Sequence, residues 1–270
     1  MKIKVSDFNL EATLDSGQVF GFTKNGDNVY EGMMGQSPVR LWQKNGMLSV
    51  VGAIHESSLR EYFDLDRDLT PIYQILQNDV GAIREPPLHN VHQKLKGLRL
   101  IRQDSWEALA CFIISSNNNV KRIQGIWKNL FLYFNSFPTP LQIAGCHERI
   151  LRQLGLGYRA PFLLHTAQFL SVNPNYLKLI READYKAAKA RVLAFPGIGE
   201  KVADCALLYG FQKYEAFPVD VWISRVMRKL YFNNRKVPEK KILRFAQKRW
   251  GQEAGYVQQY LFHGARTGIF

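Results

Sequence analysis

The stretch from residue 195 to 205, FPGIGEKVADC, constrains the fold of this chain more than any other segment. Residues 184–194 before it are rich in alanine and free of glycine and proline, which predicts a helix. A Pro-Gly pair ends that helix, and apolar residues at helical spacing predict a second one. Because Gly197 and Gly199 lack side chains, backbone N–H groups can approach an anion there, beside the positive end of the second helix. The sequence therefore predicts a helix–hairpin–helix over residues 185–211 that can hold a phosphate.

Two side chains near this hairpin can carry chemistry. Lys201 lies in the first turn of the second helix, where the helix dipole and partial burial both disfavour an ammonium and favour a nucleophilic amine. Asp220 follows a Phe-Pro-Val segment, and its carboxylate can stabilise an oxocarbenium-like sugar. Taken singly, the two have plainer explanations as a solvated lysine and a helix-capping aspartate. Together with the phosphate site, they favour bond cleavage at a sugar C1′.

The charge balance predicts a polyanionic partner. The chain has 36 Lys and Arg against 23 Asp and Glu, a formal net charge of +13, which favours nucleic acid or an anionic membrane surface. Charge alone also fits a basic protein with no such partner. No apolar run approaches the length of a membrane span, and three scattered cysteines are too few for a disulfide framework or a four-cysteine cluster. We therefore expect an intracellular protein that binds no membrane and has no metal centre.

Hydrophobic periodicity divides the chain into a sheet region and a helical region. An Asn-Gly pair at 45–46 is a strong hairpin signal, and a Pro-Pro pair at 86–87 marks a soft boundary. From about residue 90 the pattern is almost entirely helical. We predict an α+β fold, mostly α, with an N-terminal antiparallel sheet domain over 1–88 and a helical region over 89–270. Strands are expected in segments that alternate or run apolar, at 29–33, 39–43 and 47–51.

Three loops carry residues that suit a nucleic-acid surface. Residues 115–119, SSNNN, offer hydrogen-bonding side chains, with Arg122 in the first turn of the following helix. Tyr158 and Arg159 follow two glycines, and such a pair, if exposed, suits stacking and hydrogen bonding to bases. Gly17 permits close backbone approach in a turn before a strand. Each loop also has a plainer explanation: a polar inter-helix loop, a helix C-cap whose tyrosine packs inside, and a structural turn.

The C-terminal third adds positive charge and one more candidate pair. Lysines and arginines dominate beyond residue 220, some suited to a phosphate backbone and others to the solvated face of a helix. Gln258 and Phe262 share one face of the last predicted helix at i, i+4 spacing.

Together these segments resemble the 8-oxoguanine DNA glycosylase/lyase family of the helix-hairpin-helix glycosylase superfamily, from about residue 10 to residue 265. The hairpin with Lys201 and the Pro-Val-Asp220 segment are specific to the lyase members of the superfamily. Three segments are more specific to the oxoguanine branch: Ser16-Gly-Gln-x-Phe20, Ser-Ser-Asn-Asn-Asn119 and Gly-Tyr-Arg159.

The resemblance implies roles in chemistry and base recognition. Lys201 would attack C1′ and form a Schiff base, while Asp220 would stabilise the cationic sugar. The Gly17 carbonyl would accept a hydrogen bond from N7–H, a proton that 8-oxoguanine carries and guanine lacks, so discrimination rests on one buried polar mismatch. Cys205 and Phe262 would enclose the flipped base between them. The other edge of the base, its Watson–Crick edge, would be read by Gln258.

The resemblance also implies contacts to the rest of the duplex. Asn117 would fill the gap left by the flipped base and, with Arg122 and Arg159, hydrogen-bond the orphaned cytosine. Tyr158 would wedge into the opposite strand. The DNA phosphate would be held at the hairpin, by Gly197, Gly199 and Val202.

One residue departs from the family pattern, and two other functions stay open. Trp222 stands where eukaryotic members have a histidine near a phosphate, and it can donate a hydrogen bond but carry no charge. The compact chain suggests a bacterial member, a monomer that needs no cofactor to repair duplex DNA, with a cation at the hairpin left open. The alternatives are a glycosylase of the same fold for another damaged base, and a helix-hairpin-helix protein that binds DNA without chemistry.

Overall fold

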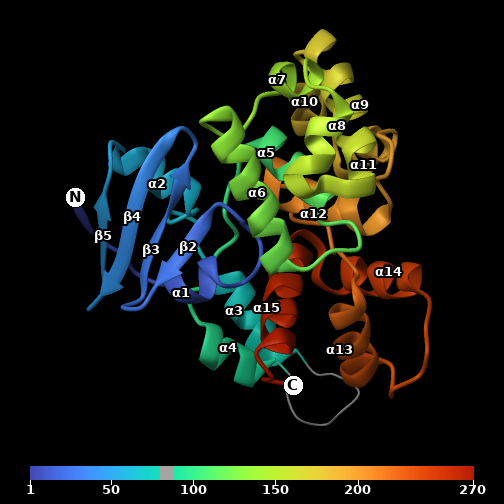
Figure 1. The fold of residues 1–270 in the computed structure, drawn as a ribbon. Coiled ribbons are helices and arrows are strands. Elements are labelled where there is room, and N and C mark those ends of the chain that lie inside the picture. Colours follow the sequence, from blue (N-terminus) through green and yellow to red (C-terminus); the bar gives the residue numbers. More distant parts are fainter. Residues whose placement is uncertain (80–87) are drawn as a thin grey trace.

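The computed structural model describes residues 1–79 and 88–270. In these ranges an N-terminal antiparallel sheet is followed by helices, which confirms the α+β, mostly α prediction (Figure 1). The strands are β1 (Lys2–Lys4), β2 (Phe22–Asn25), β3 (Val29–Met34), β4 (Ser37–Lys44) and β5 (Met47–Val51). The helices up to the hairpin are α1 (Leu10–Leu14), α2 (Glu56–Tyr62), α3 (Thr70–Asn78), α4 (His89–Leu95), α5 (Ser105–Ile114), α6 (Val120–Phe134), α7 (Pro140–Ala144), α8 (Glu148–Leu151), α9 (Ala160–Val172), α10 (Tyr176–Glu182) and α11 (Tyr185–Leu193). Those that follow are α12 (Glu200–Phe211), α13 (Val221–Tyr231), α14 (Glu239–Trp250) and α15 (Ala254–Arg266).

The sheet has the strand order β1-β5-β4-β3-β2, with all neighbours antiparallel. Asn45 and Gly46 join β4 to β5 in a two-residue turn, and both have positive φ, +51° and +71°. This is the backbone that an Asn-Gly hairpin favours, so the predicted turn is confirmed. The face of the sheet that carries Leu41 and Leu48 is buried.

The helices pack closely where small residues allow it. A Cβ built on Gly210 in α12 would lie 2.8 Å from the Cβ of Ala108, so the glycine lets α12 and α5 approach. The C-terminal helix α15 is buried along most of its length and packs against α3, α4 and α13. It thus runs through the middle of the helical region, between the sheet side and α13 (Figure 1).

The change from the hydrophobic core of the sheet to that of the helices lies earlier in the sequence than the proposed domain boundary. Leu59 and Phe63 pack with the sheet, whereas Leu69, Ile72 and Leu76 belong to the helical core. Helix α3 is therefore part of the helical packing, although it precedes the proline pair. The Pro-Pro boundary itself lies outside the described residues, and the division at residue 88 stays a proposal.

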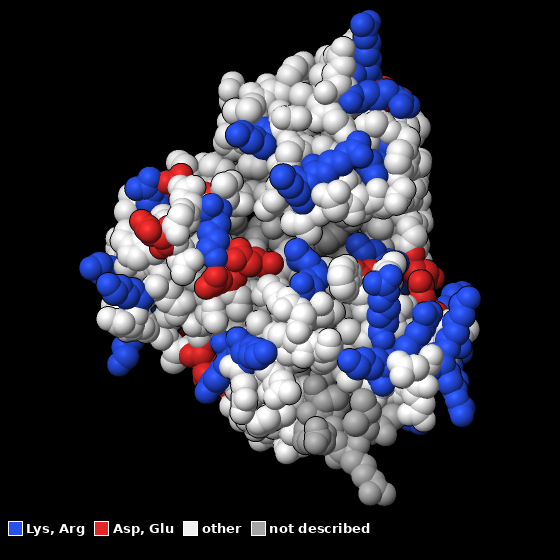
Figure 2. Space-filling model, turned by 60° about the horizontal axis from the view of Figure 1, so that its bottom comes forward, with Lys and Arg blue, Asp and Glu red and all other residues white. Residues whose placement is uncertain are grey.

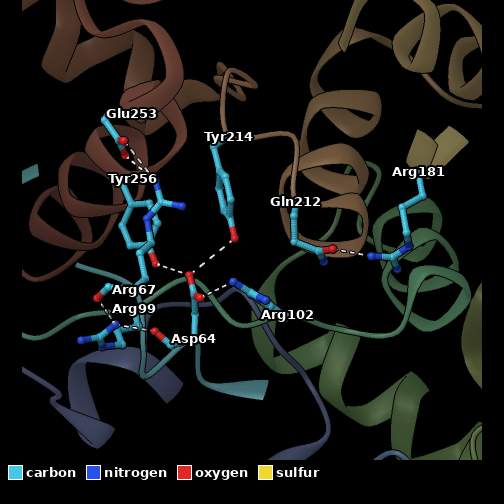
Figure 3. Close-up of polar contacts among 9 residues, drawn as sticks. All are labelled: Asp64, Arg67, Arg99, Arg102, Arg181, Gln212, Tyr214, Glu253 and Tyr256. Carbon is cyan, nitrogen blue, oxygen red and sulfur yellow. Dashed lines mark hydrogen bonds and ion pairs between the residues drawn. The ribbon is translucent and has the colours of Figure 1, made fainter. Parts of the chain in front are cut away.

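A buried carboxylate joins the sheet side to α15 (Figure 3). Asp64, between α2 and α3, accepts hydrogen bonds from Arg102 (2.5 Å) and from the hydroxyls of Tyr256 (3.1 Å) and Tyr214 (3.5 Å). A buried charge is tolerated only when it is paired and hydrogen-bonded in this way. Because Tyr256 lies in the first turn of α15, the junction holds the helix that carries Gln258 and Phe262.

Candidate active site and nucleic-acid interface

The predicted helix–hairpin–helix is present, formed by α11, a tight turn and α12. Gly197 has φ +76°, and a Cβ on it would lie 2.3 Å from the ring of Phe162. Gly199 has φ −97°, is the N-cap of α12, and has nothing within 4 Å of a built Cβ. The two glycines therefore differ. Position 197 requires glycine, because its φ is positive and a side chain would clash with Phe162. At position 199 the absence of a side chain leaves the surface open for an incoming group.

This difference gives a paired prediction for alanine substitutions. Gly197→Ala is expected to lower the free energy of unfolding by about 2–3 kcal/mol, because it adds left-handed strain to a clash with Phe162. Gly199→Ala is expected to cost at most about 1 kcal/mol, the loss of a favourable N-cap. Urea unfolding of both variants measures this, and equal stabilities would contradict the assigned geometry.

A cavity of about 430 Å³ lies beside the hairpin. Its walls come from the turn before β2, from α5, the loop after it and the start of α6, from α12 and α15, and from the segment that leads into α13. It brings together six predicted residues that are far apart in the sequence: Gly17, Lys201, Cys205, Asp220, Gln258 and Phe262. The other predicted contacts do not line this cavity in the described part of the chain.

Asp220 is a helix cap and a cavity residue at once. Its carboxylate accepts a hydrogen bond from the backbone N–H of Ile223 (2.8 Å), so the plainer explanation holds as well. Burial raises the pKa of Asp220, while backbone N–H groups and the Lys201 ammonium act in the opposite direction. The Nζ of Lys201 lies 6.0 Å from the ring centroid of Phe112. An amine and a carboxylate thus face one confined space.

The cavity holds a polar atom that lacks a partner. Gln258 is buried, and its Nε2 donates to the carbonyl of Pro218 (3.1 Å). Its Oε1 has no hydrogen-bond partner among the described residues. Buried polar atoms are normally satisfied, so this oxygen points to a donor on a bound group. Beside it, burial raises the pKa of Cys205 to about 11, so its thiol stays neutral and presents a soft apolar surface.

The turn that presents Gly17 is held by its neighbour. Gly17 has φ +80°. The Gln18 amide nitrogen donates to the carbonyls of Arg99 (2.8 Å) and Thr13 (3.0 Å), and its oxygen accepts from Ile101 N–H (2.7 Å). The supporting role of Gln18 was not predicted from the sequence, because the segment that it binds lies about eighty residues away. The Ser-Gly-Gln motif was the one sequence signal at this position.

The Asn loop and the Tyr-Arg pair lie together, because both Tyr158 and Arg159 donate hydrogen bonds to carbonyls of the loop. Tyr158 is 48% exposed and its hydroxyl donates to the carbonyl of Ser116 (3.1 Å), so it does not pack into the core. Arg159, in contrast, is buried, with only 2% of its surface exposed. Its guanidinium donates to the carbonyls of Ser116 (2.6 Å) and Asn117 (2.8 Å), because that turn has carbonyls no helix can satisfy. Asn117 itself is exposed, at φ +47°.

Two further residues, Trp222 and Arg266, line the cavity, whereas Arg122 is not part of its lining. Arg122 is exposed in the first turn of α6, whose N-cap is Asn119. Trp222 lines the cavity, is 43% exposed, and has the Arg225 guanidinium 5.8 Å from its ring. Sequence reasoning missed Arg266 in the wall, since nothing marked it beyond its position one turn after Phe262.

Positive charge is spread over the face drawn in Figure 2. Groups of Lys and Arg side chains are scattered over a mainly uncharged surface, and groups of Asp and Glu are fewer. In the described ranges no helix is long and apolar enough to cross a membrane. The same residues contain no group of three or more His, Cys, Asp or Glu that could hold a metal ion.

Comparison with known proteins finds a family match for each of the two parts of the chain. Residues 1–109 match the 8-oxoguanine DNA glycosylase N-terminal domain, and residues 110–252 match the HhH-GPD superfamily of base excision DNA repair proteins. A probable N-glycosylase/DNA lyase of Methanothermobacter thermautotrophicus is 33% identical, over all of this chain and 97% of its own length.

Two solved structures have the same fold over almost their whole length. One is MBOgg1 in complex with a low affinity DNA ligand, with a TM-score of 0.92, 29% identity, and coverage of 100% of this chain and 96% of that one. The other is the Clostridium acetobutylicum 8-oxoguanine glycosylase/lyase in complex with double-stranded DNA containing cytosine opposite to 8-oxoG. Its TM-score is 0.90, its identity 30%, and the match covers 98% of this chain and 94% of that one.

Proposed function

We propose, from the premise that this chain belongs to the 8-oxoguanine DNA glycosylase/lyase family, that it excises 8-oxoguanine opposite cytosine through a lysine Schiff base. As a member of that family it is a DNA N-glycosylase with lyase activity. The observation that carries the finer proposal is the cavity, in which Lys201 and Asp220 face an unpaired Gln258 oxygen. We further propose that it works inside the cell, as a monomer, on duplex DNA.

The chemistry assigned to the cavity has two steps. The Lys201 amine forms a bond to C1′ while the C1′–N9 bond breaks, and the electron pair of that bond leaves with the base. Asp220 balances the positive charge on the sugar in the transition state. The lysine nitrogen then loses a proton and the C1′–O4′ bond opens, with O4′ taking up a proton from water, which gives the Schiff base. In the second step this Schiff base acidifies the C2′ proton, whose loss expels the 3′ phosphate and nicks the strand.

Base recognition uses polar groups that are already in place. The Gly17 carbonyl accepts from N7–H, and guanine, with an acceptor at N7, meets a repulsive contact instead. The Gln258 oxygen accepts from the Watson–Crick edge, which ends its unpaired state. Cys205 and Phe262 bound the two faces of the base, one as a neutral thiol and the other as a ring.

The opposite strand is met by the Asn loop. We propose that Asn117 fills the gap and that Arg122 and Arg159 hydrogen-bond the orphaned cytosine, with Tyr158 wedged beside it. The burial of Arg159 is compatible with this role, because a guanidinium has five N–H donors and three are used on loop carbonyls. The hairpin, with Gly197, Gly199 and Val202, holds the phosphate at the positive end of α12.

Borohydride trapping tests the proposal directly. Incubation with a duplex that holds one 8-oxoguanine opposite cytosine is expected to give a covalent protein–DNA adduct, and an undamaged duplex is expected to give none. A panel with 8-oxoguanine opposite each other base, an oxidised pyrimidine and an alkylated purine measures selectivity. Faster excision of another lesion would refute the substrate, and salt-dependent binding without any adduct would refute the chemistry.

A further inference from the structure

Arg266 is a cation in the wall of the base cavity to which the mechanism above assigns no task. It ends α15 and lines both the base cavity and a second cavity of about 770 Å³, bounded by β2, β3 and α6. Its guanidinium carbon lies 5.4 Å from the ring centroid of Phe262. A Cβ built on Gly17 would be 2.6 Å from its Nη1, so the guanidinium lies directly against that glycine.

The Arg266 guanidinium lies against the ring of Phe262, and its N–H groups have no acceptor in the described part of the chain. Among the residues that the structure describes, no hydrogen bond or ion pair to Arg266 is present. Partial burial lowers the pKa of its guanidinium, and Asp220 and Asp15 lie near enough to oppose that effect. Because one side stays open to solvent, the charge is not costly to keep. It therefore retains free N–H donors beside Gly17 and Phe262, two of the residues proposed to meet the base.

We propose that Arg266 is a catalytic residue that donates hydrogen bonds to the lesion base and stabilises the negative charge the base acquires as it leaves. The inference rests on the proposed function, since it needs a base stacked on Phe262 with its N7–H edge at Gly17. In that orientation the oxygen at C8 adjoins the edge at Gly17. A guanidinium beside that edge meets the departing base as an anion.

The electron count explains why a cation belongs there. When the C1′–N9 bond breaks, both electrons go to the base and are shared over its imidazole ring and the C8 oxygen. The bond that forms is Nζ–C1′, and the proton that the lysine nitrogen then loses neutralises the base anion. Lys201 and Asp220 serve the sugar, so Arg266 serves the leaving group. A donor fixed where charge develops costs no reorganisation during the reaction.

Substitution of Arg266 separates this role from others, because base release and strand cleavage can be measured apart. Arg266→Gln is expected to slow single-turnover excision of 8-oxoguanine by roughly 10- to 100-fold, the scale of losing one such donor. On a duplex that already holds an abasic site opposite cytosine, nicking has no base to release. There the variant is expected to stay within about twofold of the wild type.

Two more variants complete the experiment. Arg266→Lys keeps the charge and is expected to retain most of the excision rate. Lys128→Gln removes a cation that lines only the second cavity, and is expected to leave the ratio of excision to nicking unchanged. Equal losses of excision and nicking in Arg266→Gln would reassign the residue to phosphate binding, and equal losses in the Lys and Gln variants would refute the role of charge.

The wild-type reaction distinguishes the two proposals. If the wild type excises 8-oxoguanine and Arg266→Gln does so at the same rate, only the Arg266 role is refuted. If the wild type nicks abasic duplexes but releases no 8-oxoguanine, the substrate proposal and the Arg266 role are both refuted.

Discussion

Replacing Lys201 with glutamine is expected to abolish borohydride trapping and to slow both base excision and strand nicking by roughly 10⁴-fold or more, the scale of losing a covalent nucleophile. Lys201 lies in the first turn of α12 and lines the cavity beside Asp220. Glutamine keeps most of the length and a hydrogen-bonding head, but its amide nitrogen is not nucleophilic. Trapping gels and single-turnover rates on 8-oxoguanine and abasic duplexes measure the loss.

Lys121→Gln is the matched control. Lys121 also lines the cavity, from the first turn of α6, and the substitution removes one positive charge near the same space. It is expected to weaken DNA binding in a salt-dependent way while the adduct still forms. If Lys201→Gln were trapped as well as the wild type, the Schiff base would have to be assigned to another amine.

The hairpin and the sheet could be predicted because their signals are local. The Gly-x-Gly turn, with Gly197 at positive φ, and the Asn-Gly turn of β4 and β5 need backbone that few residues adopt. The N-cap role of Asp220 is local in the same sense, since its partner is three residues away. Such features are decided by neighbours in sequence, which a single chain displays.

The surroundings of the cavity could not be predicted because they depend on segments distant in sequence. Arg159 is buried because it donates hydrogen bonds to carbonyls of the turn after α5, about forty residues earlier in the sequence. The residues around Arg159 in the sequence do not indicate these partners. Gln18 supports Gly17 through a segment beyond α4, and Asp64 joins a sheet-side loop to α15 (Figure 3). Arg266 meets Gly17 only when the last helix folds back onto the first loop. The resemblance of the motifs to a known family identified Gly17 and Arg159, but it did not identify the residues that hold them in place.

Replacing Asp220 with asparagine is expected to slow excision by about 10²-fold or more, because roughly 3 kcal/mol of charge stabilisation at the sugar is lost. Asparagine is isosteric and can still accept from the N–H of Ile223, so α13 keeps its cap. Single-turnover excision measures the change. Asp184→Asn is the control, since Asp184 caps α11 with the same geometry away from the cavity, and it is expected to leave the rate unchanged.

The pH profile tests the same residue. Since burial raises the pKa of Asp220, its carboxylate takes up a proton at a higher pH than an ordinary aspartate. Wild-type excision should therefore decline on the acid side as the pH falls through that raised pKa. The decline should be missing from the residual activity of Asp220→Asn, and an identical acid limb in the variant would assign the titration to another group.

Stability should move in the opposite direction from activity. In the unfolded chain Asp220 has its ordinary pKa, so between that value and the raised one the folded state binds more protons than the unfolded state. The free energy of unfolding contributed by Asp220 therefore decreases as the pH rises through this window, and the ionised carboxylate lowers stability above it. Asparagine removes that cost, so Asp220→Asn should be as stable as the wild type at neutral pH, or more stable. A variant less stable than the wild type at neutral pH would contradict the destabilising effect assigned here to the ionised carboxylate.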